Sequence, residues 1–493
     1  MSSVHLPILM VIAPLMAAPV CVVLRKGLPA WSLAMVTTWA SFAMALGVLF
    51  QVLESGTIVY EIGDWAAPWG IEYRIDRVSA FMAVIVAGIG SVALPYAKQS
   101  VEHEVGIHRI YLFYTMFLLC LSGLMGIAVT GDAFNLFVFL EISSLSSYVL
   151  ISLASDRRAL TAAYRYLIMG TIGATFYIIG VGMMYMMTGT LNLHDLAQRI
   201  PDVADTRTVL VALGFLTVGI SLKLALFPLH TWLPNAYAFA PSVVTVFLAS
   251  TATKVAIYVL LRIFFTVFGE VDVMDAQGVG DVLLVLALLA MFIASTVAIF
   301  QDNVKRLLAF SSLAQVGYMI LGISLATVTG VAGGIIHLYN HAIMKGALFM
   351  AVGCVFMRTG SVRVEAFTGL GRAMPVTMAA FVVGGLSLIG VPATVGFISK
   401  WYLIQAALEK GAWPLAVLIL LSSLLAIVYV WRVVEVAYFR PLPGFRGEIS
   451  EAPLAMLLPM WFLAGCSIYF GIDASTTFGI AHDAAATLLG IKP

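Results

Sequence analysis

Apolar stretches close to twenty residues long recur along the whole chain, and they restrict its fold more than any other feature. A helix of about 20 residues crosses the hydrocarbon core of a bilayer, where every backbone polar group must be hydrogen-bonded within the protein. Such stretches lie at 4–24, 31–53, 78–97, 110–128, 133–153, 165–188, 208–226, 241–262, 281–300, 306–327, 330–357, 376–403, 412–434 and 452–470. The sequence therefore predicts an all-α polytopic membrane protein with about 14 transmembrane helices.

The composition agrees with a chain that lies almost wholly in lipid. Hydrophobic residues make up 62% of it and charged residues 10%, whereas soluble domains carry about 25% charged residues. No long linker divides the sequence, so we expect a single transmembrane bundle over residues 1–493. The net charge of +1 gives no reason to expect nucleic acid as a partner.

Basic residues gather on one side of the predicted bundle. With the N-terminus outside, the segments that follow the first, third, fifth, ninth, eleventh and thirteenth helices face the cytoplasm. They carry Arg25, Lys26, Lys98, Arg157, Arg158, Lys305, Arg306, Arg358, Arg363, Arg372, Arg440 and Arg446. The acidic loops ESGTIVYEIGDW and GEVDVMDAQGVGD lie on the opposite side. The positive-inside rule therefore predicts a multi-pass protein of the cell membrane, with both termini on the periplasmic or extracellular side.

Five ionisable residues stand inside the predicted helices, and they are the best indication of function. They are Glu141, Lys223, Lys254, Lys345 and Lys400. A charge at the centre of a bilayer costs about 2.5–3.5 kcal/mol on insertion scales, so each needs an aqueous cavity or a partner. The simplest interpretation is a path that carries protons, with or without other cations, through the membrane.

Glu141 and Lys223 are natural partners, because pairing lowers the cost of placing either charge in lipid. Glu141 lies near the middle of its predicted helix and precedes several hydroxyl groups, those of Ser143, Ser144, Ser146, Ser147 and Tyr148. Alternatively, Glu141 only bridges two helices. Lys254 lies too deep in its helix to reach the membrane surface. Asp132 and Asn135 are as typical of a helix N-cap as of a functional site.

His337, His341 and Lys345 recur at every fourth residue and therefore share one helical face. They extend over about 12 Å along the axis. Histidine titrates near neutrality and can pass protons in both directions. The alternatives are hydrogen-bonded core histidines and a zinc site, but HLYNH lacks the glutamate of a zinc peptidase helix. The spacing favours a proton or water wire, and we predict no metal site.

Two predicted helices contain breaks close to a lysine. In the seventh, Pro228 follows Lys223 by five residues; the twelfth has Gly390, Pro392 and Gly396 before Lys400. Either break could be an ordinary proline kink. Because the two helices are five apart, units of five helices would have opposite orientations. The pattern predicts an inverted repeat of helices 4–8 and 9–13, each with a broken fourth helix.

The breaks also bear on two further candidates. Lys400 would be the last member of the series if its break lies at mid-membrane, and an interfacial lysine if the helix ends early. His230 follows the first break and is a candidate for a branch toward the cytoplasm.

The sequence offers no centre for catalysis or cofactor binding. The cysteines Cys21, Cys120, Cys354 and Cys466 are far apart and form no C-x-x-C pair. Neither a dinucleotide fingerprint after a strand nor a P-loop is present. We therefore expect a transport subunit without a catalytic centre or cofactor of its own, and any redox step would take place on another polypeptide.

Taken together, the segments around these residues resemble the antiporter-like subunits shared by Mrp-type cation/proton antiporters, respiratory complex I and membrane-bound hydrogenases. The resemblance rests on GDAFNLFVFLE, LKLALFPLHTWLPNAYAFAPS, the Lys254 helix, the H-x-x-x-H-x-x-x-K helix and VGFISKWYL. GDAFNLFVFLE looks most like the D-type subunit of the Mrp complexes. Lys400 differs from the complex I subunit that carries glutamate there, but it matches the subunit that ends the pump module.

The resemblance implies a core of about residues 110–434, flanked by helices at 4–97 and 452–470. It implies a hydrophilic axis at the bilayer midplane, with half-channels to each face. Glu141 and Lys223 would be the coupling pair and Lys254 the next relay. His337, His341 and Lys345 would form a bridge to Lys400.

The leading hypothesis is a proton-translocating subunit of a multisubunit antiporter, in which proton influx drives the export of sodium or another monovalent cation. Its partners would be other membrane subunits. The alternative uses the same relay in an NADH:quinone oxidoreductase or a hydrogenase. A self-contained channel or carrier and a membrane metalloprotease are weaker alternatives, since the protease would need a third metal ligand and a base near His337 and His341.

Overall fold

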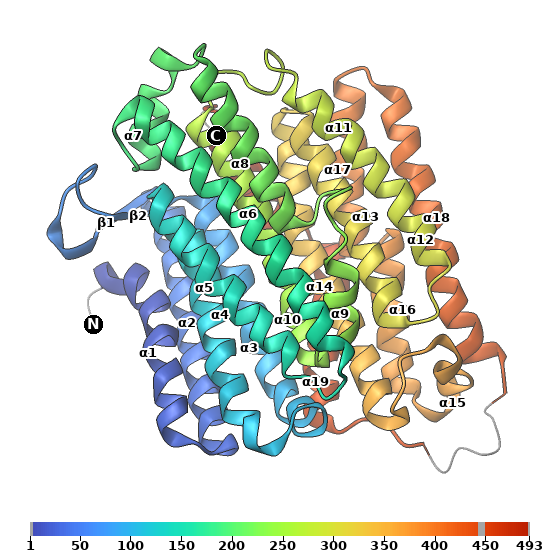
Figure 1. Cartoon of the computed structure of the whole chain (residues 1–493). Helices are drawn as coiled ribbons and strands as arrows, with labels where there is room; N and C mark the ends of the chain where they lie inside the picture. Colours follow the sequence, from blue (N-terminus) through green and yellow to red (C-terminus); the bar gives the residue numbers. More distant parts are fainter. Residues whose placement is uncertain (1–2, 442–448, 492–493) are drawn as a thin grey trace.

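The computed structural model describes residues 3–441 and 449–491, and nearly all of them are helical (Figure 1). Thirteen helical stretches among these residues are long and apolar enough to cross a membrane. A fourteenth crossing is made by two half-helices, α16 (Pro375–Ile389) and α17 (Val395–Glu409). The predicted all-α polytopic fold is confirmed. An even number of crossings would place the start of α1 and the end of α19 on one face, and which aqueous side that is stays a prediction.

The other spanning segments follow one another along the chain, and one of them consists of two shorter helices joined by a π-helical turn. They are α1 (Leu6–Leu24), α2 (Gly27–Ser55), α3 (Arg77–Glu104), α4 (Ile110–Val129), α5 (Ala133–Ser152), α6 (Arg158–Thr188), α8 (Arg207–Leu224), α10 (Ser242–Leu261), α11 (Val279–Leu289), α12 (Ser295–Ile299), α13 (Val304–Ser324), α14 (Val328–Thr359), α18 (Trp413–Phe439) and α19 (Leu454–Ile472). A π-helical turn extends α10 to Val267, and another joins α11 to α12. The short helices are α7 (Leu193–Arg199), α9 (Leu233–Phe239), α15 (Leu370–Ala373) and α20 (Ser475–Leu488).

Several helices are longer than their apolar stretches predicted, and the third and the sixth differ most. The third was expected to end at residue 97, but α3 continues to Glu104. The sixth was expected to begin at residue 165, but α6 begins at Arg158. The last turns of α3 bury Ser100, Val101 and Glu104 within the protein. A helix end that packs against the rest of the chain can carry polar residues, so apolar length underestimates it.

Two further elements lie outside the predicted spans. A two-stranded antiparallel hairpin, β1 (Ile58–Glu61) and β2 (Glu72–Ile75), joins α2 to α3. The helix α20 follows α19 and packs against α3 and α14. It is held by a stacked Phe478–Tyr402 pair at 3.5 Å and an Asp483–Arg77 ion pair at 3.3 Å.

The core of the bundle is formed by α10, α13 and α14. Buried residues make up 94% of the spanning parts of α10 and α13, but only 33% of that of α18, which lies at the edge (Figure 1). α10 packs against α8 and α14, and α14 packs in turn against α13 and α17. These contacts place the helices that carry the predicted relay residues in the order α8, α10, α14, α17 through the protein interior.

Both predicted helix breaks are present. α8 ends where Ala225 takes left-handed backbone angles (φ 60°), and the indole of Trp232 donates to the carbonyl of Leu222 in the last turn at 3.0 Å. α16 ends at Gly390, whose φ of +93° is a conformation that glycine adopts without strain. The helix resumes as α17 after Thr394.

The second break requires a glycine at position 396, where the start of α17 presses against the end of α16. A Cβ atom on Gly396 would lie 1.8 Å from the carbonyl oxygen of Ser387. Gly396→Ala is therefore expected to shift the backbone and destabilise the chain by about 1–3 kcal/mol. Gly465→Ala is the matched control, because a Cβ there meets nothing within 4 Å. Thermal unfolding in detergent would measure both, and equal melting temperatures for the two variants would contradict the prediction.

Candidate functional site

The predicted Glu141–Lys223 pair is present at the start of the candidate site. Lys223, in the last turn of α8, places its Nζ 3.2 Å from Glu141 Oε1 and donates to Ser144 Oγ at 2.7 Å. The Lys223 side chain is 4% exposed, whereas that of Glu141 is 24% exposed. Lys223 thus lies inside the protein, while Glu141 reaches its outer surface. Asp132 accepts from the backbone N–H of Asn135 at 2.6 Å and is the N-cap of α5.

A small cavity lies between Lys223 and α10. It has a volume of about 20 Å³ and is lined by Ser144, Ser147 and Lys223 on one side and by Ala252 and Val255 of α10 on the other. A cavity of this size holds about one water molecule when polar groups line it. A single water between α8 and α10 would give the coupling pair a link toward the Lys254 helix.

Lys254 is fully buried in α10 and has no carboxylate partner among the ion pairs of the described residues. Its ammonium donates to the carbonyl of Ala249, one turn back, and lies 3.3 Å from Thr253 Oγ1. These contacts satisfy part of its hydrogen-bonding capacity without neutralising its charge. Lys254 is thus enclosed by the protein, and its depth in the membrane stays a prediction.

His337 is held between two side chains that the sequence interpretation missed. Its Nδ1 lies 2.7 Å from Ser399 Oγ of α17, and its Nε2 lies 2.9 Å from Gln315 Oε1 of α13. Both contacts fix the plane of the imidazole and connect α14 to the helices on either side. Gln315 could have been identified from the sequence, because its amide side chain stands inside the otherwise apolar run LAQVGYMIL.

His341 lies parallel to His337, with ring centroids 6.2 Å apart and planes inclined by 13°. It is fully buried, and neither of its ring nitrogens has a hydrogen-bond partner among the described residues. Because buried polar atoms are nearly always hydrogen-bonded, water is expected to complete these contacts. Lys345, one turn further, donates to Leu308 O at 2.8 Å and to Ser311 Oγ.

Lys400 occupies the second helix break. Its Nζ donates to the carbonyl oxygens of Leu388 at 3.1 Å and Ile389 at 2.8 Å, and it lies 4.8 Å from the centre of the Tyr318 ring. The residue is 5% exposed, and α17 continues for nine residues beyond it. The alternative of an interfacial lysine at a helix end is therefore wrong.

His230 is not brought together with the other predicted residues. It lies in the break between α8 and α9, half-buried, with its ring stacked on Phe227 at 5.2 Å. None of the hydrogen bonds or ion pairs of the described residues joins it to Glu141, Lys223 or Lys254. Its role as a branch stays a prediction.

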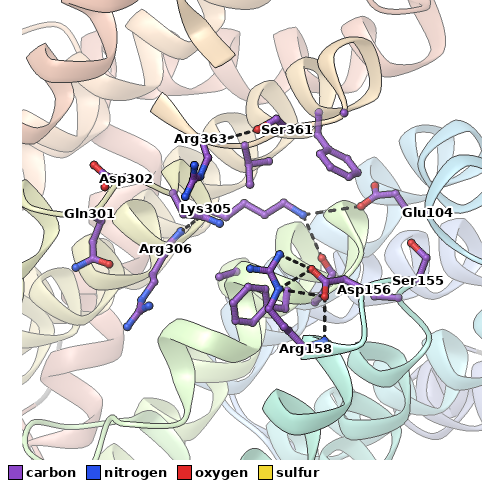
Figure 2. Close-up of a pocket in the computed structure, with 18 of the residues that line it drawn as sticks. Glu104, Ser155, Asp156, Arg158, Gln301, Asp302, Lys305, Arg306, Ser361 and Arg363 are labelled. Atoms are coloured by element: carbon purple, nitrogen blue, oxygen red, sulfur yellow. Dashed lines mark hydrogen bonds and ion pairs between the residues drawn. The ribbon is translucent and has the colours of Figure 1, made fainter. Parts of the chain in front are cut away.

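A large cavity opens at one end of the bundle, and four of the twelve predicted cytoplasmic basic residues line it, Arg158, Lys305, Arg306 and Arg363. It has a volume of about 680 Å³ and is lined by residues from α3, α9, α13 and the loops before α6 and after α14 (Figure 2). Lys305 points into it, with its Nζ 3.9 Å from Glu104 Oε2 and 3.1 Å from Ala240 O. At its rim, hydrogen bonds from Arg158 hold the pKa of the Asp156 carboxyl below its ordinary value.

Glu104 links this cavity to the Lys254 helix. Its Oε2 accepts from the backbone N–H of Ser242 at 2.9 Å and from Ser242 Oγ at 3.1 Å, at the first residue of α10. A carboxylate at a helix N-terminus satisfies free N–H groups and interacts favourably with the helix dipole. The sequence interpretation missed Glu104 and Lys305, because both stand at the ends of apolar stretches, where charges usually face water.

A comparison with known protein families finds one match along the middle of the chain. Residues 130–426 match the model described as "NADH:quinone oxidoreductase/Mrp antiporter, TM". This range includes α5 to α17 and therefore all the predicted relay residues.

Curated relatives of two kinds are similar over almost the full length. The chain is 42% identical to the N-type subunit of the NADH-quinone oxidoreductase of Desulforudis audaxviator, covering 95% of this chain and 96% of the relative. It is 31% identical to the D-type subunit of the Na(+)/H(+) antiporter of Alkalihalophilus pseudofirmus, covering 89% of this chain and 88% of the relative.

Solved structures of two kinds superpose equally well. A chain of the Mrp complex from Dietzia sp. DQ12-45-1b matches with a TM-score of 0.91 at 25% identity, covering 99% of this chain and 98% of that one. A chain of the membrane-bound sulfane sulfur reductase, an archaeal respiratory membrane complex, also matches with a TM-score of 0.91, at 32% identity and the same coverage. The family match and the near full-length relatives together show that this chain belongs to the NADH:quinone oxidoreductase/Mrp antiporter transmembrane family.

Proposed function

We propose that this chain is a proton-translocating membrane subunit of a multisubunit monovalent cation/proton antiporter, with sodium as the expected cation. Protons would move along Glu141, Lys223, Lys254, the residues His337, His341 and Lys345 of α14, and Lys400. The observation that carries the proposal is the Glu141–Lys223 ion pair, which lies beside a series of buried lysines and histidines on neighbouring helices. The resemblance to the antiporter's D-type subunit and to the Mrp complex supports the antiporter form of the proposal.

The helix packing supports a path that is continuous inside the protein. Lys254, His337, His341 and Lys345 are all fully buried, on helices that pack directly against one another. An ammonium that holds only carbonyl and hydroxyl partners can lose a proton without leaving a carboxylate unpaired. The lysines beyond Lys223 are therefore suited to passing protons rather than to storing a fixed ion pair.

The surface around Glu141 supports assembly with other membrane subunits. Glu141 stands in a stripe of exposed apolar residues on α5, with exposures from 37% to 50%, formed by Phe134, Val138, Leu145 and Val149. These residues recur with a helical period and therefore form one outward face. A carboxylate within such a face costs free energy in lipid. A neighbouring subunit that covers the face with a polar group would remove this cost.

A second function is favoured by the relatives themselves. The 42% identity to a subunit of an NADH-quinone oxidoreductase and the 32% identity to the chain of a sulfane sulfur reductase support the same relay in a redox-driven complex. In that case the partners would carry the redox centres, and this chain would still only move protons.

To test whether an ion gradient or a redox reaction drives transport, the complex is copurified with this chain after gentle detergent extraction. Mass spectrometry then identifies the copurifying subunits, and a pH-sensitive dye follows proton movement in reconstituted vesicles after sodium is added. For an antiporter we expect only membrane subunits, with proton flux that starts on sodium addition. Copurifying flavin-, nickel- or iron–sulfur-binding chains, with no sodium-driven flux, would replace the antiporter proposal by the redox-driven one.

A further inference from the structure

The ammonium of Lys400 is bound by main-chain oxygen atoms that the end of α16 leaves free. The last carbonyl groups of a helix have no N–H partner within that helix. Leu388 O and Ile389 O are two of these groups, and both accept hydrogen bonds from Lys400 Nζ, at 3.1 and 2.8 Å. The carbonyl of Leu386, two residues before Leu388, is already used by the N–H groups of Gly390 and Val391. Two carbonyl oxygens thus converge on one positive charge inside the bundle.

Several further features of the break favour a cation at this point. The partial negative charge of the α16 C-terminus faces the ammonium. The Tyr318 ring lies 4.8 Å from Lys400 Nζ, within the range of a cation–π contact. Gly390 leaves the space for the side chain, because a Cβ there would lie 3.0 Å from Lys400 Cδ. The break is therefore built around a single monovalent cation, which in this structure is the ammonium group.

Among the described residues, no carboxylate forms an ion pair with Lys400. The two lysines that do form ion pairs are Lys223, with Glu141, and Lys305, with Glu104. The described contacts bring two other ionisable groups of the surrounding helices toward it. Tyr318 of α13 does so through its ring, and His337 of α14 through Ser399. At neutral pH the net charge of the site is therefore the charge of the cation that binds the two carbonyl oxygens.

Lys400 differs in this respect from the other buried lysines. Lys254 and Lys345 also donate to carbonyl groups, but those of Ala249 and Leu308 belong to the continuous helices α10 and α13. Those oxygens also serve the hydrogen bonds of their own helices. Lys305 also donates to a carbonyl at a helix end, that of Ala240 after α9, but to one oxygen only and beside the Glu104 carboxylate. Among the described residues, Lys400 is the only lysine that binds two such oxygens without a carboxylate partner. Such half-helix ends coordinate cations in other transporter folds.

We propose that the carbonyl oxygens of Leu388 and Ile389 form a binding site for a monovalent metal cation that competes with the Lys400 ammonium. When an N–H bond of the ammonium breaks, its proton passes to a water molecule, and the neutral amine releases the two oxygens. A sodium-sized cation then takes their place, completing its coordination with water. The site carries one positive charge in either state, so protonation of Lys400 and binding of the metal exclude each other. The proposal rests on the proposed antiporter function and assigns its cation site.

The test uses the purified complex in weakly buffered detergent solution. Sodium chloride is added at constant ionic strength against choline chloride, whose cation is too large for the carbonyl pair. A pH-sensitive dye measures proton release, and radioactive sodium measures binding. In the wild type we expect each bound sodium ion at this site to displace one proton, and sodium affinity to fall as the pH falls.

Two substitutions at position 400 have opposite expected effects. Arginine stays protonated and keeps the oxygens occupied, so Lys400→Arg should weaken sodium binding at least tenfold and remove this proton release. Lys400→Met leaves the oxygens free, so sodium should bind without proton release, and its affinity should no longer depend on pH. The control Lys410→Met removes the exposed lysine at the end of α17 and should behave like the wild type.

Sodium-linked proton release that persists undiminished in Lys400→Arg and Lys400→Met would overturn the proposed site. If neither variant assembles, the wild type still decides, because sodium binding that is independent of pH excludes the competition. Failure of the antiporter function gives a different result. In that case sodium drives no proton flux in vesicles, while displacement of a proton at Lys400 can still be measured in detergent.

Discussion

Replacing Lys223 by alanine is expected to abolish proton transport while the complex still assembles. Lys223 donates to both Glu141 and Ser144 and lies 4% exposed at the break of α8, so no neighbouring group can take its place. Loss of a positioned proton-transfer group lowers rates by roughly 100-fold or more. The measurement is sodium-dependent or redox-dependent proton flux in vesicles, at equal amounts of assembled complex. Lys410→Ala, at an exposed lysine, is the control for a general effect of removing a positive charge.

Lys223→Arg separates proton transfer from simple pairing. A guanidinium keeps the charge and can still bind the Glu141 carboxylate, but it does not release a proton at physiological pH. If Lys223 is a relay, the arginine variant assembles and transports as poorly as Lys223→Ala. Flux near the wild-type level in Lys223→Arg would mean that the residue serves only as the partner of Glu141.

The second large effect is expected at the opposite end of α10 from Glu104. Arg262 forms two hydrogen bonds with the carboxylate of Asp76 and also donates to Ser79 Oγ at 2.7 Å and to the Tyr258 hydroxyl at 2.9 Å. The two charged side chains are 9% and 16% exposed. Removing one partner of such a pair leaves a buried charge unpaired and typically costs about 3–5 kcal/mol. Asp76→Ala and Arg262→Ala should therefore each destabilise the chain strongly.

A double-mutant cycle distinguishes an unpaired charge from lost packing. The Asp76→Ala/Arg262→Ala variant has no uncompensated charge, so its stability should be higher than the sum of the single effects predicts. Arg158→Ala breaks an Arg–Asp pair that is also hydrogen-bonded but lies on the surface, with the arginine side chain 70% exposed, and should cost less than about 1 kcal/mol. Denaturant or thermal unfolding in detergent compares the four variants. Additive losses at positions 76 and 262 would contradict the account.

The parts of the site that could be predicted from sequence are those where lipid makes a charge expensive. Glu141 and Lys223 had to find partners, and each is the partner of the other. The contacts of Lys400 could not be predicted, because main-chain oxygens become available only where α16 ends. Gln315 is uncharged and so gave a weaker signal, although it fixes the orientation of His337.

In the fold, too, local features could be predicted from the sequence and long-range contacts could not. Long apolar runs predicted the crossings, and prolines and glycines predicted both breaks, because these properties are local. The helix α20 was missed because its 14 residues are too few for a crossing and are rich in alanine. Its place depends on contacts with α14 and with α3, and α3 lies hundreds of residues earlier in the chain. The burial of Glu104 and Lys305 likewise arises only when α3, α10 and α13 come together.

The position of Glu141 on the outward stripe of α5 also has a consequence in time. Its internal partner, Lys223, follows 82 residues later in the chain. At about 5–20 residues per second, synthesis of that interval takes roughly 4–16 s. During this interval α5 can enter the bilayer while the Glu141 carboxylate has no partner. In copies of the chain that meet no neighbouring subunit, the carboxylate stays partly exposed even after Lys223 is in place. We therefore expect a new chain to be most open to membrane proteases before α8 is inserted, and its lifetime to shorten when neighbouring subunits are absent.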